Sequence, residues 1–430
     1  MLQRKRRFSI GVLLRTSLLA TSILYASGFA FPAMAAESGG EIQELKQQMQ
    51  AMMQRIKELE AKQTKPVDEK VVAEEKKATD LAKAVQPYGQ ARLSVDNYSD
   101  DFGEGKDGAG GKGSTIKSNA SRFGIKGEMP TSFDGTNMIY QAEVLYGAAD
   151  NATNEIQWRE GFAGLQGGWG KTRLGRLDVP YKTTLTTVDP WNDNAPQSRG
   201  FGGVQGSSAL HASYFTNTAE YISPSFKGVN ISAWYSDQLD DETSGIHDAS
   251  PISNYQGGEA KGLGVNFKQG GLFLGADWID VNATRIGTTS STATANLTTG
   301  VVSSATTFSA NNKMHNDSGW QAAAKYGQGP WSVAAFYEDV KDLGLGANTY
   351  VNGIYKIGNT SLIATYGLNR DATQYSNRDI DTWSLGTKYA LTKTSELFAA
   401  WVNRSEDAYG STPSKDYQIL TVGMNAKFGY

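Results

Sequence analysis

Apolar and polar residues alternate along most of the chain after residue 87, in segments of about ten residues. In the last of these segments Leu420, Val422 and Met424 share one face, whereas Thr421 and Gly423 share the other. A period of two is typical of a β-strand whose two faces meet different surroundings. The pattern therefore predicts an all-β domain over residues 87–430.

The pattern predicts sixteen strands, and the connections between them fall into two classes. Seven connections are short, and they alternate with eight longer ones, which is typical of a transmembrane barrel with periplasmic turns and external loops. The short connections lie at residues 130–135, 167–170, 224–228, 269–271, 327–330, 357–360 and 390–394. The predicted strands begin near Gly89, Ser121, Asn137, Trp158, Lys171, Ala219, Val229, Gly258, Leu272, Gly319, Trp331, Thr349, Ser361, Asp381, Glu396 and Tyr417.

A soluble β-sandwich, or a barrel around an enclosed cavity, would show the same alternation. The region has no linker although it is longer than a usual domain, and the mean hydropathy of −0.43 is low for a chain rich in strands. Aromatic residues recur on the apolar faces at strand ends, as in the interfacial girdles of membrane barrels. They are Tyr140, Tyr146, Trp278, Trp331, Tyr355, Tyr366, Trp401 and Tyr430. We therefore expect a 16-stranded antiparallel transmembrane β-barrel around a water-filled lumen.

A different pattern precedes the barrel. Apolar residues are spaced alternately by three and four, which predicts a coiled-coil helix over residues 36–66. A single helix lying on its own barrel is the alternative, but a helix of this length is marginal in water without a partner. Residues 67–86 are charged, rich in alanine and without clear periodicity, and they are predicted to be a linker. The apolar positions are Ile42, Leu45, Met49, Met52, Ile56 and Leu59.

The first 35 residues are predicted to be a cleaved secretory signal. Residues 4–7 are all basic, an apolar stretch follows, and Ala33 and Ala35 form a small-x-small cleavage pattern. A membrane anchor is the alternative, although Arg15 shortens the apolar run. The chain has no cysteine, so disulfide bonds cannot stabilise its fold.

Several stretches resemble the general Gram-negative porin family, and its neisserial-type branch in particular. They are SRFGIKG at 121–127, GLQGGWG at 164–170 with LGR at 174–176, EYISPSFKG at 220–228, and FGY at 428–430. The resemblance covers residues 87–430. It implies an outer-membrane homotrimer in contact with membrane lipid, through which small hydrophilic solutes and ions diffuse passively. It also implies that the terminal Tyr430 is part of the signal that the barrel-assembly machinery recognises.

The resemblance further implies that the third loop, residues 177–212, folds into the lumen and narrows it. That loop carries Asp178, Asp189, Asp193 and Arg199. The parity of the strands places a set of charges on the opposite inner wall: Arg92, Arg122, Lys126, Glu143, Lys171 and Arg173. Arg176 follows Gly175, where the chain can break parity, and the resemblance places it at the constriction. Opposed charges across a narrow aqueous gap orient polar solutes and disfavour apolar ones.

Other functions are less consistent with the residues. The histidines His211, His247 and His315 have no recognisable catalytic partner, so we expect no enzyme. The loop acids match no calcium-binding spacing, and neither a metal nor another cofactor is expected. An acidic mature chain without a basic stripe does not indicate nucleic-acid binding.

Two alternatives to a general diffusion channel stay open. The helix could tether the barrel to the cell envelope, which would make the protein chiefly structural. The basic inner wall could instead make the channel selective for anionic solutes, although acidic outer loops could offset this preference.

Overall fold

The computed structural model describes residues 39–63, 83–99, 113–149, 156–199, 206–212, 214–238, 255–285, 289–296, 301–308, 314–371, 379–408 and 414–429. The chain divides into two compact units, Met1–Glu75 and Lys76–Tyr430. The predicted signal peptide, most of the predicted linker and Tyr430 lie outside the described residues.

The first unit contains the predicted helix, α2 (Gly39–Gln63). Its apolar residues Met49, Met52 and Ile56 are all more than half exposed. None of the helices in the described parts of the chain is both long and apolar enough to span a membrane. The coiled coil that this exposed stripe suggests stays a prediction.

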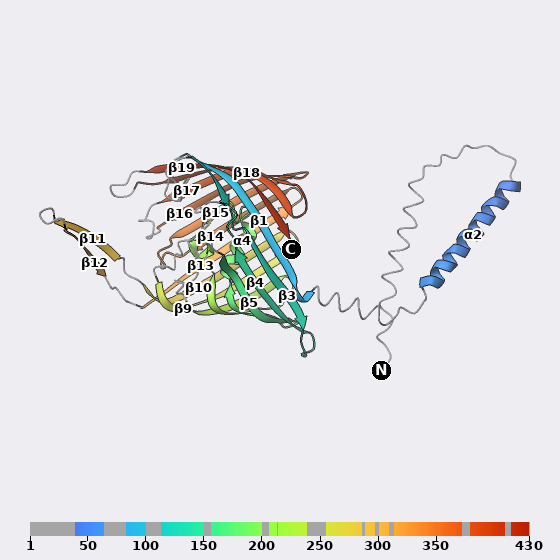
Figure 1. The fold of residues 1–430 in the computed structure, drawn as a ribbon, viewed down its shortest axis with the longest axis horizontal. Coiled ribbons are helices and arrows are strands. Elements are labelled where there is room, and N and C mark those ends of the chain that lie inside the picture. The colour runs from blue at the N-terminus through green and yellow to red at the C-terminus, as the bar shows by residue number, and fades with distance from the viewer. Residues whose placement is uncertain are drawn as a thin grey trace. The chain divides into compact units, whose positions relative to one another are not determined.

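The second unit is a closed antiparallel barrel (Figure 1). The first strand, β1, pairs with the last, β19, from Gly89 opposite Phe428 to Tyr98 opposite Ile419, so the sheet has no edge. Two short segments, β2 and β3, both pair with β1 and act as one strand with a break at Ala120, where φ is 56°. Counting these two as one strand confirms the prediction of sixteen.

The strands begin within five residues of the predicted starts if β3 is taken for the segment predicted at Ser121, and all seven predicted short turns are present. A hairpin between β10 and β13 was not predicted; it forms a separate sheet (Figure 1). The barrel strands are β1 (Gln86–Tyr98), β2 (Gly113–Ser118), β3 (Arg122–Pro130), β4 (Thr136–Leu145), β5 (Gln157–Gly167), β6 (Gly170–Leu177), β7 (Phe215–Ile222), β8 (Val229–Gln238), β9 (Tyr255–Gln269), β10 (Leu272–Arg285), β13 (Met314–Gln328), β14 (Trp331–Asp339), β15 (Ala347–Ile357), β16 (Thr360–Arg370), β17 (Ile380–Ala390), β18 (Ser395–Glu406) and β19 (Lys415–Phe428). The hairpin consists of β11 (Thr289–Asn296) and β12 (Val301–Phe308).

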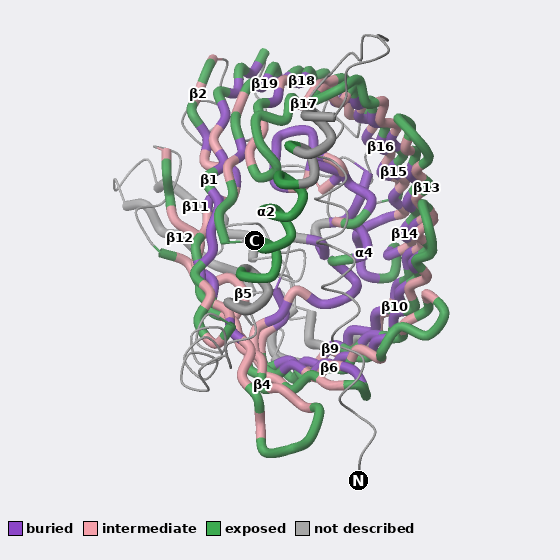
Figure 2. Tube along the Cα trace, turned by 90° about the vertical axis from the view of Figure 1, so that its right-hand side faces the viewer, coloured by how far each residue is buried: buried purple, intermediate pink, exposed green. Residues whose placement is uncertain are grey.

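Burial in the barrel is inverted relative to a water-soluble protein (Figure 2). On β1 the polar residues Gln90, Arg92 and Ser94 are buried, whereas on β19 the apolar Leu420 and Val422 are 55% and 54% exposed. A continuous outer band of apolar side chains around a polar interior is typical of a surface that meets lipid. The alternation therefore places lipid outside and a polar lumen inside, as the sequence predicts.

One long connection folds into the lumen. It follows β6 and includes α4 (Pro180–Val188) and the 3-10 helix η1 (Ala209–Ala212). Pro180 suits the first turn of a helix because its missing N–H is not needed there. Figure 2 shows α4 inside the ring of strands. The described residues 178–199 and 206–212 are called the inward segment below.

The inward segment is packed against one side of the barrel wall. Leu185 and Val188 of α4 share a buried cluster with Phe336 and Tyr350 from β14 and β15. Further along, Trp191 packs against Phe398 of β18 with ring centroids 6.2 Å apart. This apolar attachment leaves the charged side of the segment facing the wall formed by β1 and β3 to β5.

Candidate pore constriction

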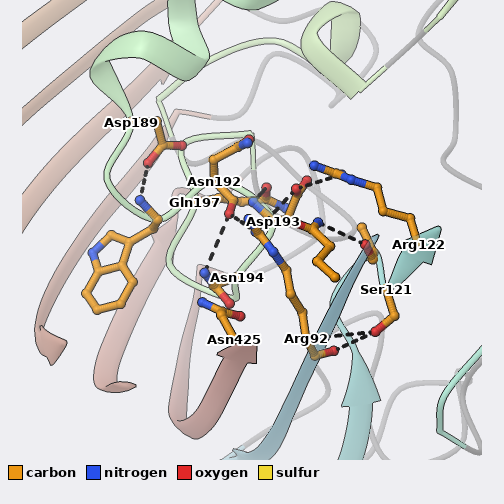
Figure 3. Close-up of polar contacts among 12 residues, drawn as sticks. Arg92, Ser121, Arg122, Asp189, Asn192, Asp193, Asn194, Gln197 and Asn425 are labelled. Atoms are coloured by element: carbon orange, nitrogen blue, oxygen red, sulfur yellow. Dashed lines mark hydrogen bonds and ion pairs between the residues drawn. The ribbon is translucent and has the colours of Figure 1, made fainter. Parts of the chain in front are cut away.

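Asp193 of the inward segment meets three guanidinium groups (Figure 3). Its Oδ2 lies 3.3 Å from Nη1 of Arg92 and 3.2 Å from Nη1 of Arg122, and its Oδ1 pairs with Arg199. Burial alone would raise the pKa of Asp193, but these three arginines, together with Arg159, outweigh it and hold the pKa well below its usual range. Asp193 therefore carries a permanent negative charge opposite the basic wall.

The basic wall continues through a second set of ion pairs. The carboxylate of Glu143 on β4 lies 3.4 Å from Nε of Arg122 and 2.8 Å from Nε of Arg159 on β5. On β6, Arg173 is 2.5 Å from Glu220 and 2.7 Å from Glu160. Glu143 is thus shared by two arginines and Arg173 by two acids, which holds the side chains in one arrangement.

Lys182 of α4 contributes a cation from the inward segment itself. Its Nζ lies 2.6 Å from Oδ1 of Asp178 and 3.9 Å from the centroid of the Tyr214 ring. Burial lowers the pKa of Lys182 to about 8, because the loss of hydration outweighs the attraction of Asp178. This lysine can therefore change its charge in the mildly alkaline range.

Two cavities lie beside the inward segment and share Thr186 and Asn192 in their linings. One measures about 270 Å³ and is bounded chiefly by β1, β3, β4 and β5; the other measures about 400 Å³ and is bounded by β17, β18, β19 and β1. The charged residues of the first are Arg122, Lys126, Glu143, Arg159, Glu160, Asp178, Lys182, Asp193 and Arg199. Those of the second are Arg92, Lys388, Lys393, Glu396 and Lys427.

The structure brings together seven of the eleven predicted site residues in the linings of these cavities. They are Arg92, Arg122, Lys126, Glu143, Asp178, Asp193 and Arg199. Arg173 lies on the wall in its pairs with Glu160 and Glu220. Lys171 lies two residues nearer to the turn on the same strand and lines neither cavity.

Arg176 lies where the alternation of β6 breaks, as the sequence analysis expects. The pairing of β6 with β7 shifts between Gly175 and Leu177, and Gly175 has φ of 146°. A Cβ at this glycine would collide with the backbone of Gly161, so only glycine fits. The guanidinium of Arg176 lies 5.1 Å from the centroid of the Tyr214 ring and lines neither cavity.

Asp189 is the predicted loop acid that the structure places differently. It is buried, and its carboxylate accepts hydrogen bonds from the N–H groups of Trp191 and Ser198, each 2.8 Å long. The hydroxyl of Tyr350 donates a third, 3.1 Å long. In this position Asp189 shapes the turn after α4 and does not face either cavity.

Strict alternation does not identify several charges of the site. Arg159 and Glu160 are adjacent on β5, yet both line the first cavity, because the pairing of β4 with β5 shifts between Ala142 and Val144. A bulge inserts an extra residue into one strand, and a pattern that repeats every two residues cannot reveal it. Lys182 and the wall residues Lys388, Glu396 and Lys427 were also not predicted, although the last three lie on strands whose parity could have indicated them.

Comparison with known proteins agrees with this geometry. The profile of the Gram-negative porin family matches residues 20–408. The chain is similar to the major outer membrane protein P.IB of Neisseria sicca, with 31% identity over 159 residues, and to that of Neisseria gonorrhoeae, with 29% over 193 residues. These alignments cover 36% and 43% of the chain and 40% and 49% of the relatives, so the chain spans less than half the length of the curated relatives that it matches.

Solved structures share the fold at low sequence identity. An anion-selective porin from Comamonas acidovorans superposes with a TM-score of 0.58 at 16% identity, covering 80% of this chain and 99% of that one. The trimer form of OmpT from Vibrio cholerae superposes with a TM-score of 0.52 at 16% identity, with the same coverage. Because the family profile covers most of a chain that folds as a closed 16-stranded barrel, the chain belongs to the Gram-negative porin family and is a protein of the bacterial outer membrane.

Proposed function

We propose that the barrel is a channel through which small hydrophilic solutes and ions diffuse passively, narrowed by the inward segment. One observation carries this proposal: Asp193 on the inward segment faces Arg92 and Arg122 on the wall. This cluster and the other fixed charges that line the two cavities produce a field in the passage, which orients dipolar solutes and raises the barrier for apolar ones. A channel of this kind needs neither a cofactor nor catalytic chemistry.

The balance of charge in the lumen favours anions. Nine Lys and Arg side chains line the two cavities, against five Asp and Glu side chains. Fixed positive charge in a narrow aqueous passage concentrates anions and excludes cations. The similar fold of a porin named as anion-selective is consistent with this preference.

Planar lipid bilayers test the channel directly. In a potassium chloride solution, the wild-type protein is expected to give discrete conductance steps. Under a salt gradient, the sign of its reversal potential should show that chloride passes more readily than potassium. Asp193→Asn should increase this preference by about two- to fivefold, because it removes the negative charge that faces three arginines. A bilayer that stays closed would contradict the channel.

The control for this measurement is Asp371→Asn. Asp371 lies at the exposed end of β16 and pairs with Lys341 at 3.0 Å, away from both cavities. The control should leave the reversal potential close to that of the wild type. If the two variants shift it equally, the charge at Asp193 has no special role in selectivity.

For the assembly we propose a homotrimer that is stabilised by association of the α2 helices of its three subunits. The exposed apolar stripe of α2 supports self-association, and a similar barrel, OmpT, is described in a trimer form. We also propose that Tyr430, at the end of the alternating last strand, helps the assembly machinery to recognise the barrel.

The exposed stripe on α2 also favours a second function, in which the helix tethers the outer membrane to a periplasmic partner. Deleting residues 37–86 separates the two functions. Loss of envelope integrity with unchanged conductance would make the tether the main role. Unchanged integrity together with a less stable oligomer would favour the role in trimer formation.

A further inference from the structure

A fully buried carboxylate on the barrel wall collects an unusual number of hydrogen bonds. Glu338 lies on β14, on the side where the inward segment is packed. Its Oε1 accepts from the hydroxyls of Tyr181 at 2.7 Å and Ser208 at 2.8 Å, and lies 3.1 Å from Nε2 of His211. Its Oε2 accepts from the N–H of Ser208 at 2.8 Å and from Nδ2 of Asn348 at 3.0 Å.

These contacts join both ends of the inward segment to one side chain. Tyr181 lies in the first turn of α4, near the beginning of the segment, whereas Ser208 and His211 lie near its end. The two ends are more than twenty residues apart in sequence and meet at Glu338. Glu338 thereby ties both ends of the segment to one point of the wall, in addition to the apolar contacts of α4 and Trp191.

The surroundings of Glu338 make this contact hard to replace. The rings of Tyr181 and His211 are stacked with centroids 5.2 Å apart, and Phe336 meets the edge of His211 at 5.5 Å. Tyr181 and Leu210 also belong to an apolar cluster inside the barrel. Because buried polar groups are stable only when hydrogen-bonded, loss of the acceptor would leave several donors without a partner.

A short chain of contacts leads from Glu338 to the constriction. The carbonyl of His211 accepts a 2.7 Å hydrogen bond from Nη1 of Arg199. Arg199 in turn pairs with Asp193, the acid that faces Arg92 and Arg122 on the opposite wall. Glu338 contacts neither cavity.

We infer that Glu338 is a positioning residue of the pore, which fixes the place of Asp193 in the lumen by tying both ends of the inward segment to β14. The inference rests on the proposed channel function. It predicts that the segment moves between alternative positions when this carboxylate is lost, so that the current through one open channel varies in time. A residue that only supports folding would not change the current of channels that have already inserted.

The test compares Glu338→Gln with Glu396→Gln in the full-length mature protein. Each substitution removes one negative charge from the inner wall. Glu396 accepts its hydrogen bonds from Lys388 and Asn425, which are both wall residues. The comparison therefore separates positioning from electrostatics. Folding of each variant is checked first by its heat-dependent mobility in SDS gels.

Single-channel recordings in planar bilayers give the result. The expected outcome is that E338Q spends about ten times longer than wild type in altered conductance levels, because losing a buried carboxylate acceptor shifts the population of displaced states by about that factor. E396Q should change the reversal potential but keep a single, steady level. If E338Q and E396Q show equally steady currents, the inference is overturned.

Two milder variants keep the inference testable if E338Q does not fold. Tyr181→Phe and Ser208→Ala each remove one hydroxyl that donates to Glu338, at opposite ends of the segment. Each should increase the time in altered levels by a smaller factor, and steady currents in both would overturn the inference. A wild-type protein that gives no conductance at all would instead overturn the channel function.

Discussion

At the scale of single residues, the same carboxylate group has different roles according to its partners. Asp193 faces three arginines and contributes charge to the lumen, whereas Asp189, four residues earlier, accepts hydrogen bonds from Trp191, Ser198 and Tyr350 and shapes the chain. Burial alone does not distinguish them, since both are nearly inaccessible. The difference lies in whether the neighbours are cations or neutral donors.

The titration of Lys182 predicts that the ion selectivity of the channel depends on pH. Since its pKa is lowered to about 8, it is mostly protonated at pH 7 and mostly neutral at pH 9. Raising the pH over this range removes one positive charge from the lumen, so the preference for anions should fall. The reversal potential of wild-type channels at pH 7 and pH 9 measures this change, and Lys182→Met should show a smaller change.

Lys126→Met is the matched control. It also removes a lysine from the lining of the first cavity but leaves Lys182 in place, so its response to pH should resemble that of the wild type. An identical response of all three proteins would mean that Lys182 does not titrate in this range.

At the scale of elements, some charges of the candidate site lie where the regular pairing of the strands is interrupted. The register shifts at Ala142/Val144 and Gly175/Leu177 lie on the strands that carry Arg159, Glu160 and Arg176. A bulge reorients neighbouring side chains and increases local twist, so a wall with bulges can present more charges to the lumen than regular strands allow. The helix α2 instead keeps a regular pattern, along which Met49, Met52 and Ile56 are exposed.

The exposed stripe of α2 gives a prediction on assembly. The double variant Met52→Asp, Ile56→Asp should weaken the oligomer, because it places charges at positions that must pack against another helix in a coiled coil. Chemical cross-linking and sedimentation of the full-length protein in detergent would measure this. Gln50→Asp, Gln54→Asp adds the same charge at outward positions and should have little effect; equal effects would argue against the coiled coil.

At the scale of the whole molecule, the barrel separates two solvents. Its outer face is apolar and exposed, its inner face is polar, and closure between β1 and β19 pairs the backbone along both edges. The lumen is also asymmetric, since apolar clusters fill the side beneath the inward segment and charges line the other. In the proposed channel, the open passage therefore lies on the charged side of the inward segment.

Because the outer face of the barrel meets lipid, a charged residue placed there should strongly destabilise the folded protein. Val422 lies near the middle of β19 and faces outward, so Val422→Arg should reduce the free energy of folding into lipid vesicles by about 2–4 kcal/mol. Ser132→Arg, in an exposed turn, should cost about 0–1 kcal/mol. Equilibrium unfolding by denaturant in vesicles measures both, and equal penalties would contradict the assignment of Val422 to the lipid.

The fold was largely predictable because its signals are local. Alternation such as that of Leu420, Thr421 and Val422 depends only on neighbouring residues, and turns such as residues 167–170 follow from nearby glycines. The sequence alone therefore determined the number of strands, the two faces of the wall and the helix before the barrel. Strand parity also indicated four of the fourteen charged residues that line the two cavities, and the family resemblance indicated three more on the inward segment.

Only the tertiary structure decided how the inward segment is held and which charges meet. Tyr181 and Glu338 are 157 residues apart, and no pattern in either neighbourhood predicts their contact. The same is true of Arg92 and Asp193, or of the bulge that turns both Arg159 and Glu160 inward. Such contacts depend on which side of the closed barrel the segment packs against, and the apolar residues that hold it there come from elements far apart in the sequence.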